Sequence, residues 1–154
     1  MDYKKKLKDL DTVDALKYTE GIINTAHDPL IILYEDFKVA LANRFFYQTF
    51  EVKPEETEGQ LIYALGNHQW DIPKLRQLLE EILPKTTSFD NFEVEHDFPS
   101  LGKRIMLLNA CRIYMEANRT KLIIITIKDI TDRKKIDELQ DKVRELERRL
   151  KTNF

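Results

Sequence analysis

The sequence predicts an α+β fold, in which short helices cover one face of a five-stranded antiparallel sheet and a long helix follows. Three observations predict this class. Two short apolar runs, residues 29–34 and 37–42, flank a Glu-Asp turn in the manner of a β-hairpin. Three more strand-like runs come after a helical stretch. Residues 132–151 contain neither glycine nor proline and repeat apolar residues every three or four positions. Two strands and then three, separated by helices, fit one antiparallel sheet.

The composition excludes several classes of protein. The chain has 154 residues, which suits one domain with an appended element. Its 25 basic and 27 acidic side chains leave a net charge of −2, so no nucleic-acid partner is expected. The 4 glycines are too far apart for a phosphate-binding loop, and 1 cysteine permits neither a disulfide nor a Cys-x-x-Cys metal site. No run suits a signal peptide or a membrane span, so the sequence predicts a cytoplasmic protein without membrane contact.

The elements are predicted in order along the chain. Residues 1–26 are expected to form a flanking helix, because a leucine or valine recurs every three positions from Leu7 to Leu16. After the hairpin, Asn43 is expected to cap a short helix. The helical stretch is predicted as residues 44–50, 57–65 and 73–84, with a loop at 66–73. The last three strands are predicted over residues 89–97, 104–115 and 121–130.

The C-terminal residues 132–154 are predicted to pair as a coiled coil. The apolar residues fall at the a and d positions of a heptad repeat: Ile136, Leu139, Val143, Leu146 and Leu150. Isoleucine or valine at a positions with leucine at d favours parallel pairs. Lys142 then occupies a g position and can attract Glu147, an e position of the partner. The alternative is an amphipathic helix that lies on its own domain.

Three segments resemble the PAS domain family. Residues 22–50 (IINTAHDPLIILYEDFKVALANRFFYQTF) have the entry helix, hairpin and helix-opening Asn of that family. Residues 65–113 resemble the PAS sensors of bacterial and archaeal histidine kinases, including those fused to chemotaxis methylesterase and methyltransferase modules. Residues 127–135 (IKDITDRKK) match the family's D-[IV]-T-[DE]-R junction between the last strand and the signalling helix. The likeness spans about residues 12–140.

The resemblance implies an organisation and a function. It divides the chain into a flanking helix (1–26), a PAS sensor domain (27–131) and a signalling helix (132–154). It implies a homodimeric sensory module of a two-component signalling protein, which passes a change in its core or in a bound small molecule to a downstream kinase or other output. A ligand-free interaction and dimerisation adaptor is the alternative.

The resemblance also implies two sets of functional residues. Asp129, Thr131 and Arg133 would transmit the signal from strand to helix, although they could instead form an ordinary helix cap with a surface ion pair. Between sheet and helices, a cavity would be lined by Phe45, Phe46, Phe50, Leu78, Ile82, Ile105, Leu107, Asn109, Ile125 and Ile127. These residues could equally fill a core without a cavity. Asn109, polar within an apolar strand, needs a ligand, a water or a backbone group as partner.

The sequence identifies no particular cofactor: none is expected to be bound covalently, haem and flavin are not expected, and no catalytic step is expected. Haem could in principle use His68, but the surrounding loop carries no haem signature. The stretch at 65–69 lacks the cysteine that flavin-binding light sensors carry, and Cys111, within a strand, is expected to behave as a small hydrophobic residue. No nucleophile, base and orienting group can be assembled, so the chain is not expected to be an enzyme. No histidine follows His96, so the C-terminal helix holds no phosphoacceptor.

Overall fold

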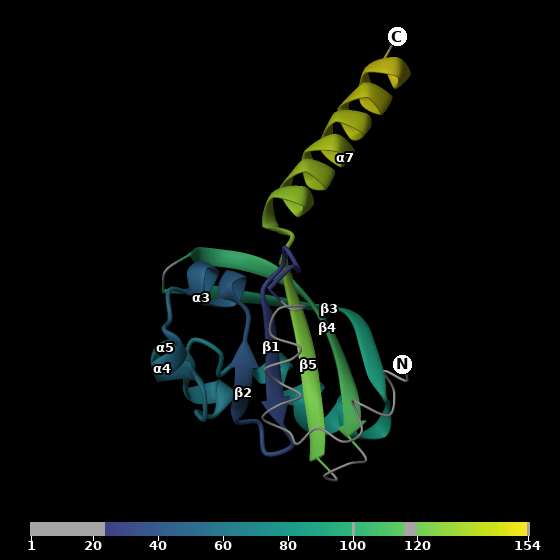
Figure 1. Cartoon of the computed structure of the whole chain (residues 1–154). Helices are drawn as coiled ribbons and strands as arrows, with labels where there is room; N and C mark the ends of the chain where they lie inside the picture. Colours follow the sequence, from purple (N-terminus) through teal and green to yellow (C-terminus); the bar gives the residue numbers. More distant parts are fainter. Residues whose placement is uncertain (1–23, 100, 116–119, 154) are drawn as a thin grey trace, which may run out of the picture.

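The structure, a computed structural model, describes residues 24–99, 101–115 and 120–153 (Figure 1). It contains one five-stranded antiparallel sheet with the strand order β2-β1-β5-β4-β3. The strands are β1 (Leu30–Tyr34), β2 (Val39–Ala42), β3 (Ser88–Phe98), β4 (Gly102–Met115) and β5 (Thr120–Asp129). This confirms the predicted α+β class and the five strands. The flanking helix predicted over residues 1–26 falls almost wholly outside the described residues.

Short helices lie between the second and third strands. They are α3 (Arg44–Phe50), α4 (Pro54–Thr57), a 3₁₀ turn (Ile62–Ala64), α5 (Leu65–His68) and α6 (Pro73–Arg76), which continues as a π-helical turn (Gln77–Ile82) and a 3₁₀ turn (Leu83–Lys85). A long helix, α7 (Thr131–Thr152), follows β5. Figure 1 shows the short helices gathered at the sheet and α7 projecting away from it.

The prediction of a helix over residues 57–65 is wrong. The backbone leaves the helical conformation at Glu58 and takes a positive φ of 78° at Gly59. The next residues pair with the free edge of β2 instead. The Val39 N–H donates to Gln60 O (2.8 Å), and the Gly59 N–H donates to Val39 O (2.8 Å). Edge-strand backbone groups need partners, and a helix through this segment would have left them unpaired.

Both faces of the sheet are apolar, as the sequence predicts. The face under the short helices contributes Ile31, Leu33, Val94, Phe98, Met106, Leu108, Ala110, Ile123, Ile125 and Ile127 to the main core. The opposite face carries a second, smaller buried cluster of Leu30, Ile32, Leu41 and Leu122. Burial on two sides explains why the central strands lack a polar alternation.

Asn43 caps α3, as the sequence predicts, and it also holds the hairpin. Its side-chain Oδ1 accepts hydrogen bonds from the N–H groups of Phe46 (3.0 Å) and Leu30 (3.0 Å), and its Nδ2 donates to Asp28 O (2.9 Å). The residue is fully buried. One side chain therefore joins the helix, the first strand and the segment before it.

The Asn43→Ala variant is expected to lower the free energy of unfolding by about 1–3 kcal/mol, because it removes the side-chain cap of α3 and leaves the buried Leu30 N–H without its acceptor. Urea denaturation monitored by circular dichroism measures the loss. Asn43→Asp is the matched control: its carboxylate still accepts from both N–H groups but cannot donate to Asp28 O. If alanine and aspartate cost the same, the cap and strand bonds are not the source of the stability.

Candidate functional site

At the junction between β5 and α7, a group of hydrogen bonds is centred on Thr131. Thr131 is buried, and both its backbone N–H and its hydroxyl donate to Asp129 Oδ1, the former over 3.0 Å. The Thr131 Oγ1 in turn accepts from the Ile105 N–H of β4 over 2.9 Å. A backbone bond from the Ile130 N–H to Ile105 O (2.9 Å) lies beside it. The start of the helix is therefore hydrogen-bonded to β4 through two consecutive residues, Ile130 and Thr131.

Thr131 does not act as an ordinary helix cap. The residue in the N-cap position is Ile130, whose side chain makes no capping bond, and Thr131 is the first helical residue. Because its hydroxyl bonds to Asp129 and the backbone of β4, it joins the strand to the helix rather than satisfying the helix end. Thr131 is therefore not the N-cap residue, but Asp129 Oδ1 accepts from the first N–H of α7, which is what the alternative of a helix cap requires.

Asp129 forms an ion pair with Arg104 of β4. Its Oδ2 lies 3.3 Å from Arg104 Nη1, and both side chains are about one-third exposed. Arg133, which the sequence places in the same motif, is exposed and forms no ion pair within the described residues. The structure therefore brings Asp129 and Thr131 together with Arg104, and it leaves Arg133 apart.

A second contact ties the first turn of α7 to the sheet. Lys134 Nζ lies 2.8 Å from Glu93 Oε1 on the edge strand β3. The hydrogen bond to Glu93 raises the pKa of Lys134 above its ordinary value. Sequence reasoning missed this pair and Arg104, since only the strand register shows which charges on distant segments meet.

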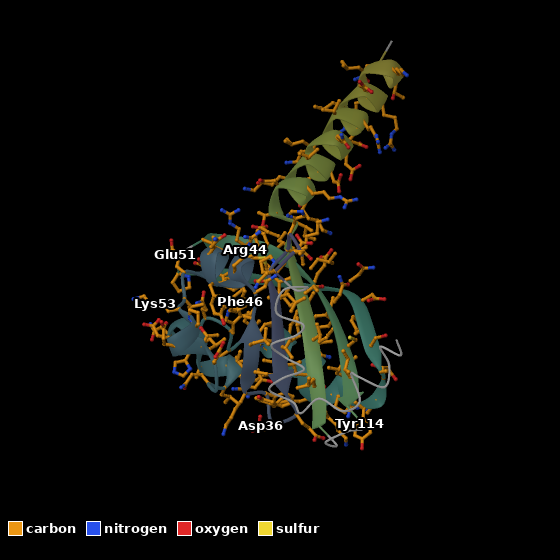
Figure 2. The ribbon with its side chains drawn as sticks, in the orientation of Figure 1. Asp36, Arg44, Phe46, Glu51, Lys53 and Tyr114 are labelled. Atoms are coloured by element: carbon orange, nitrogen blue, oxygen red, sulfur yellow. The ribbon has the colours of Figure 1, made fainter. Side chains whose placement is uncertain are left out.

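The apolar seam of α7, defined as Ile136, Leu139, Val143, Leu146 and Leu150, is exposed to solvent. These five side chains are 53–60% exposed, although they are large and apolar. Figures 1 and 2 show the helix projecting away from the sheet beyond its first turn. The alternative of a helix lying along its own domain is therefore wrong for the described residues.

Six of the ten predicted cavity residues belong to the core under the short helices. Phe46, Phe50, Leu78, Ile125 and Ile127 are buried there, and Ile82 packs against them half-buried. Phe45 lies outside that core, where its ring meets His27 (6.0 Å between centroids) and the Arg44 guanidinium (4.9 Å).

The other three, Ile105, Leu107 and Asn109, lie on the opposite face of the sheet, so their prediction as cavity residues is corrected. Their neighbours Met106, Leu108 and Ala110 point to the helices instead. Alternate residues of a strand face opposite sides, and β4 is apolar on both, so its sequence does not distinguish them.

Asn109 has a backbone partner. Its Oδ1 accepts from the Asn91 N–H (2.9 Å), and its Nδ2 donates to Thr126 Oγ1 (3.4 Å). Asn91 has a positive φ of 59° within a β-bulge of the edge strand, where the β3–β4 register shifts. Of the three partners left open by the sequence, the structure shows a backbone group.

Aromatic rings occupy the core under the short helices. The Trp70 ring lies 4.7 Å from Phe50, 5.3 Å from Phe98 and 5.9 Å from Phe46 between ring centroids. Trp70 is 2% exposed, so the loop that contains it is part of the core.

Two polar atoms in this loop are buried without a partner in the described residues, Trp70 Nε1 and Gln69 Oε1. Just before them, Gly66, Asn67 and His68 all have positive φ angles, of 52°, 59° and 63°. Such a left-handed turn is strained at residues other than glycine. The geometry of the turn could not be anticipated from the sequence.

The two residues considered as cofactor ligands have other surroundings. His68 is exposed, with its Nδ1 3.2 Å from Tyr63 O. Cys111 lies half-buried on the sheet, where burial and, secondarily, Asp90 raise the pKa of its thiol. Across the described ranges, histidine, cysteine and acidic side chains form no group of three suited to a metal ion.

Comparison with known proteins places the fold in a family. The family described as PAS domain matches residues 27–132, which is most of the chain. The chain belongs to the PAS domain family. Among the described residues, no helix has the length and apolar character needed to cross a membrane.

Solved structures agree on the fold. The PAS domain of Bordetella pertussis BvgS is 21% identical, with 88% of this chain and 98% of that chain covered and a TM-score of 0.57. The PAS domain of nitrogen regulation protein NR(II) from Vibrio parahaemolyticus is 17% identical, with 72% and 96% covered and a TM-score of 0.57. A PAS domain from a two-component sensor histidine kinase is 14% identical, with 77% and 99% covered and a TM-score of 0.51. No curated protein matches the chain.

Proposed function

We propose that this PAS domain is the sensory and dimerisation module of a two-component signalling protein, with a histidine kinase as its output. The observation that carries the proposal is the exposed apolar seam of α7, which begins five residues after a junction hydrogen-bonded to the sheet. A seam of this kind buries itself most simply against a second copy. The junction then connects that dimer to the domain core.

The charges of α7 support a parallel pair. Arg144 pairs with Asp141, and Arg148 and Arg149 both pair with Glu145 along the same helix. Lys142 and Glu147 form no ion pair within the described residues. As g and e positions they are therefore available to each other across two parallel helices.

The kinase context is supported by likeness and by the chemistry of the helix. One similar structure is the PAS domain of a two-component sensor histidine kinase. Because no histidine follows His96 in this sequence, phosphotransfer would belong to a joined kinase, and we assign this chain no catalytic step. A single cysteine suits the cytoplasm, the compartment we propose.

A sensor function would place a small polar ligand near Trp70 Nε1 or Gln69 Oε1, which have no hydrogen-bond partner within the described residues. Trp70 Nε1 can donate and Gln69 Oε1 can accept, so a hydroxyl-bearing molecule would satisfy both kinds of group. The alternative, a ligand-free adaptor, is favoured by the close ring packing around Trp70. Native mass spectrometry of the purified chain separates the two: a co-purified small molecule supports the sensor, and its consistent absence supports the adaptor.

The junction is tested in the chain joined to a histidine kinase core. Asp129→Ala and Thr131→Ala are each expected to change the autophosphorylation rate by about 5-fold or more, because allosteric coupling typically has that size. Radiolabelled phosphate incorporation measures the rate, and circular dichroism verifies that the sensor stays folded.

Glu138→Ala is the matched control, because Glu138 is an exposed residue of α7 outside the junction and the seam. It is expected to leave the rate unchanged. Normal autophosphorylation in both junction variants would reduce Asp129 and Thr131 to structural residues.

A further inference from the structure

The contact between α7 and the edge strand β3 lies on one particular side of the helix. Lys134 and Thr131 are three residues apart, so their side chains are separated by about 60° around the helix axis. Thr131 is bonded to β4 and Lys134 to Glu93 of β3. The helix is thus held at two points, on two neighbouring strands, by one side of its first turn.

The apolar seam lies on the other side. Taking about 100° per residue, the centre of the seam is about 160° from Lys134 around the axis. In the heptad that places Ile136 at an a position, Lys134 is an f position, which faces away from a coiled-coil partner. The Glu93–Lys134 pair can therefore persist when two copies pair through the seam.

One anchor alone would leave the helix free to turn. Thr131 is the first residue of α7, so the bonds from its side chain can act as a pivot for the helix that follows. Glu93, on a different strand, resists that rotation because its carboxylate must stay near Lys134. Both side chains are partly exposed, at 40% for Lys134 and 46% for Glu93, so the pair can open without unfolding the sheet.

We propose that the Glu93–Lys134 ion pair sets the rotational position of α7 relative to the sheet, so that β3 determines which way the apolar seam faces. This rests on the proposed function, in which that seam pairs two copies. The ion pair makes strand β3 a second input to the signalling helix, separate from the Asp129–Thr131 junction.

The test measures the position of α7 in the full chain by pulsed electron spin resonance. Spin labels are placed at Lys53 and Arg144, both exposed, in a Cys111→Ser background, and labelled chain is diluted with excess unlabelled chain. The parent is expected to give one narrow distance distribution. Glu93→Gln and Lys134→Gln should both broaden it, with the favoured orientation losing about two- to fivefold in relative population.

The reversed pair, Glu93→Lys with Lys134→Glu, is expected to restore the narrow distribution. High salt should broaden the parent distribution, because it screens exposed charges. The matched control is Glu95→Gln, which removes the Glu95–Lys103 pair (3.1 Å) between β3 and β4 without touching the helix. It should leave the distribution narrow.

Equal widths in all variants would overturn the proposal, and so would equal broadening by Glu95→Gln. Sedimentation of the same samples separates this result from the proposed function. A monomeric parent would contradict pairing through the seam, while the intramolecular distances would still test the ion pair.

Discussion

The Phe46→Ala variant is expected to lower the free energy of unfolding by about 3–5 kcal/mol, because removing a buried aromatic ring leaves a cavity. Phe46 is fully buried and its ring contacts Phe50 (5.0 Å between centroids) and Trp70. Trp70 is the only tryptophan, so its fluorescence during urea denaturation reports on this core. A loss of this size is a large part of the stability of a small domain.

Phe45→Ala is the matched control for this prediction. Phe45 is the preceding residue of the same helix and the same residue type, but it lies outside the main core. It is expected to cost about 1 kcal/mol or less. Equal losses in the two variants would show that the core is not organised around Phe46.

Replacing both Leu139 and Leu146 with lysine is expected to convert a dimer into a monomer. The two leucines are the d positions of the seam, 60% and 57% exposed in the single chain. Charged side chains there would have to be buried against their own copies, at a cost that a seam of about three heptads does not offset. Sedimentation velocity measures the change, and circular dichroism shows whether α7 remains helical.

The control for this variant adds two lysines outside the seam, by Glu138→Lys with Thr152→Lys. Both positions are exposed and lie at c positions of the heptad. This control is expected to stay dimeric. If the leucine variant also stays dimeric, the interface lies elsewhere in the chain.

The parts of the fold that local patterns determine were predictable. Proline, glycine and turn residues bound the hairpin and most helices, and Asn43 was identified as a cap because its residue type suits that position. The seam of α7 was identified because its apolar residues repeat at helical spacing on a charged background. These features depend on residues that are close in sequence.

The features that depend on long-range pairing could not be predicted. Which side of β4 faces the helices was ambiguous, because both sides are apolar, and this misplaced Ile105 and Leu107. The helix expected at residues 57–65 does not form, because part of this segment pairs with the edge of β2. Arg104 joined the junction, and Glu93 the first helical turn, only through the strand register. Each outcome was decided by a partner far along the chain.

The uninterrupted course of α7 has a mechanical consequence. Its 22 residues contain neither glycine nor proline, so it behaves as one stiff lever about 33 Å long. A tilt of about 10° at its base displaces its far end by roughly 6 Å, from the geometry of a rod of that length. Sub-ångström adjustments beside Thr131 can thus be magnified into movements of several ångströms at the far end of the helix.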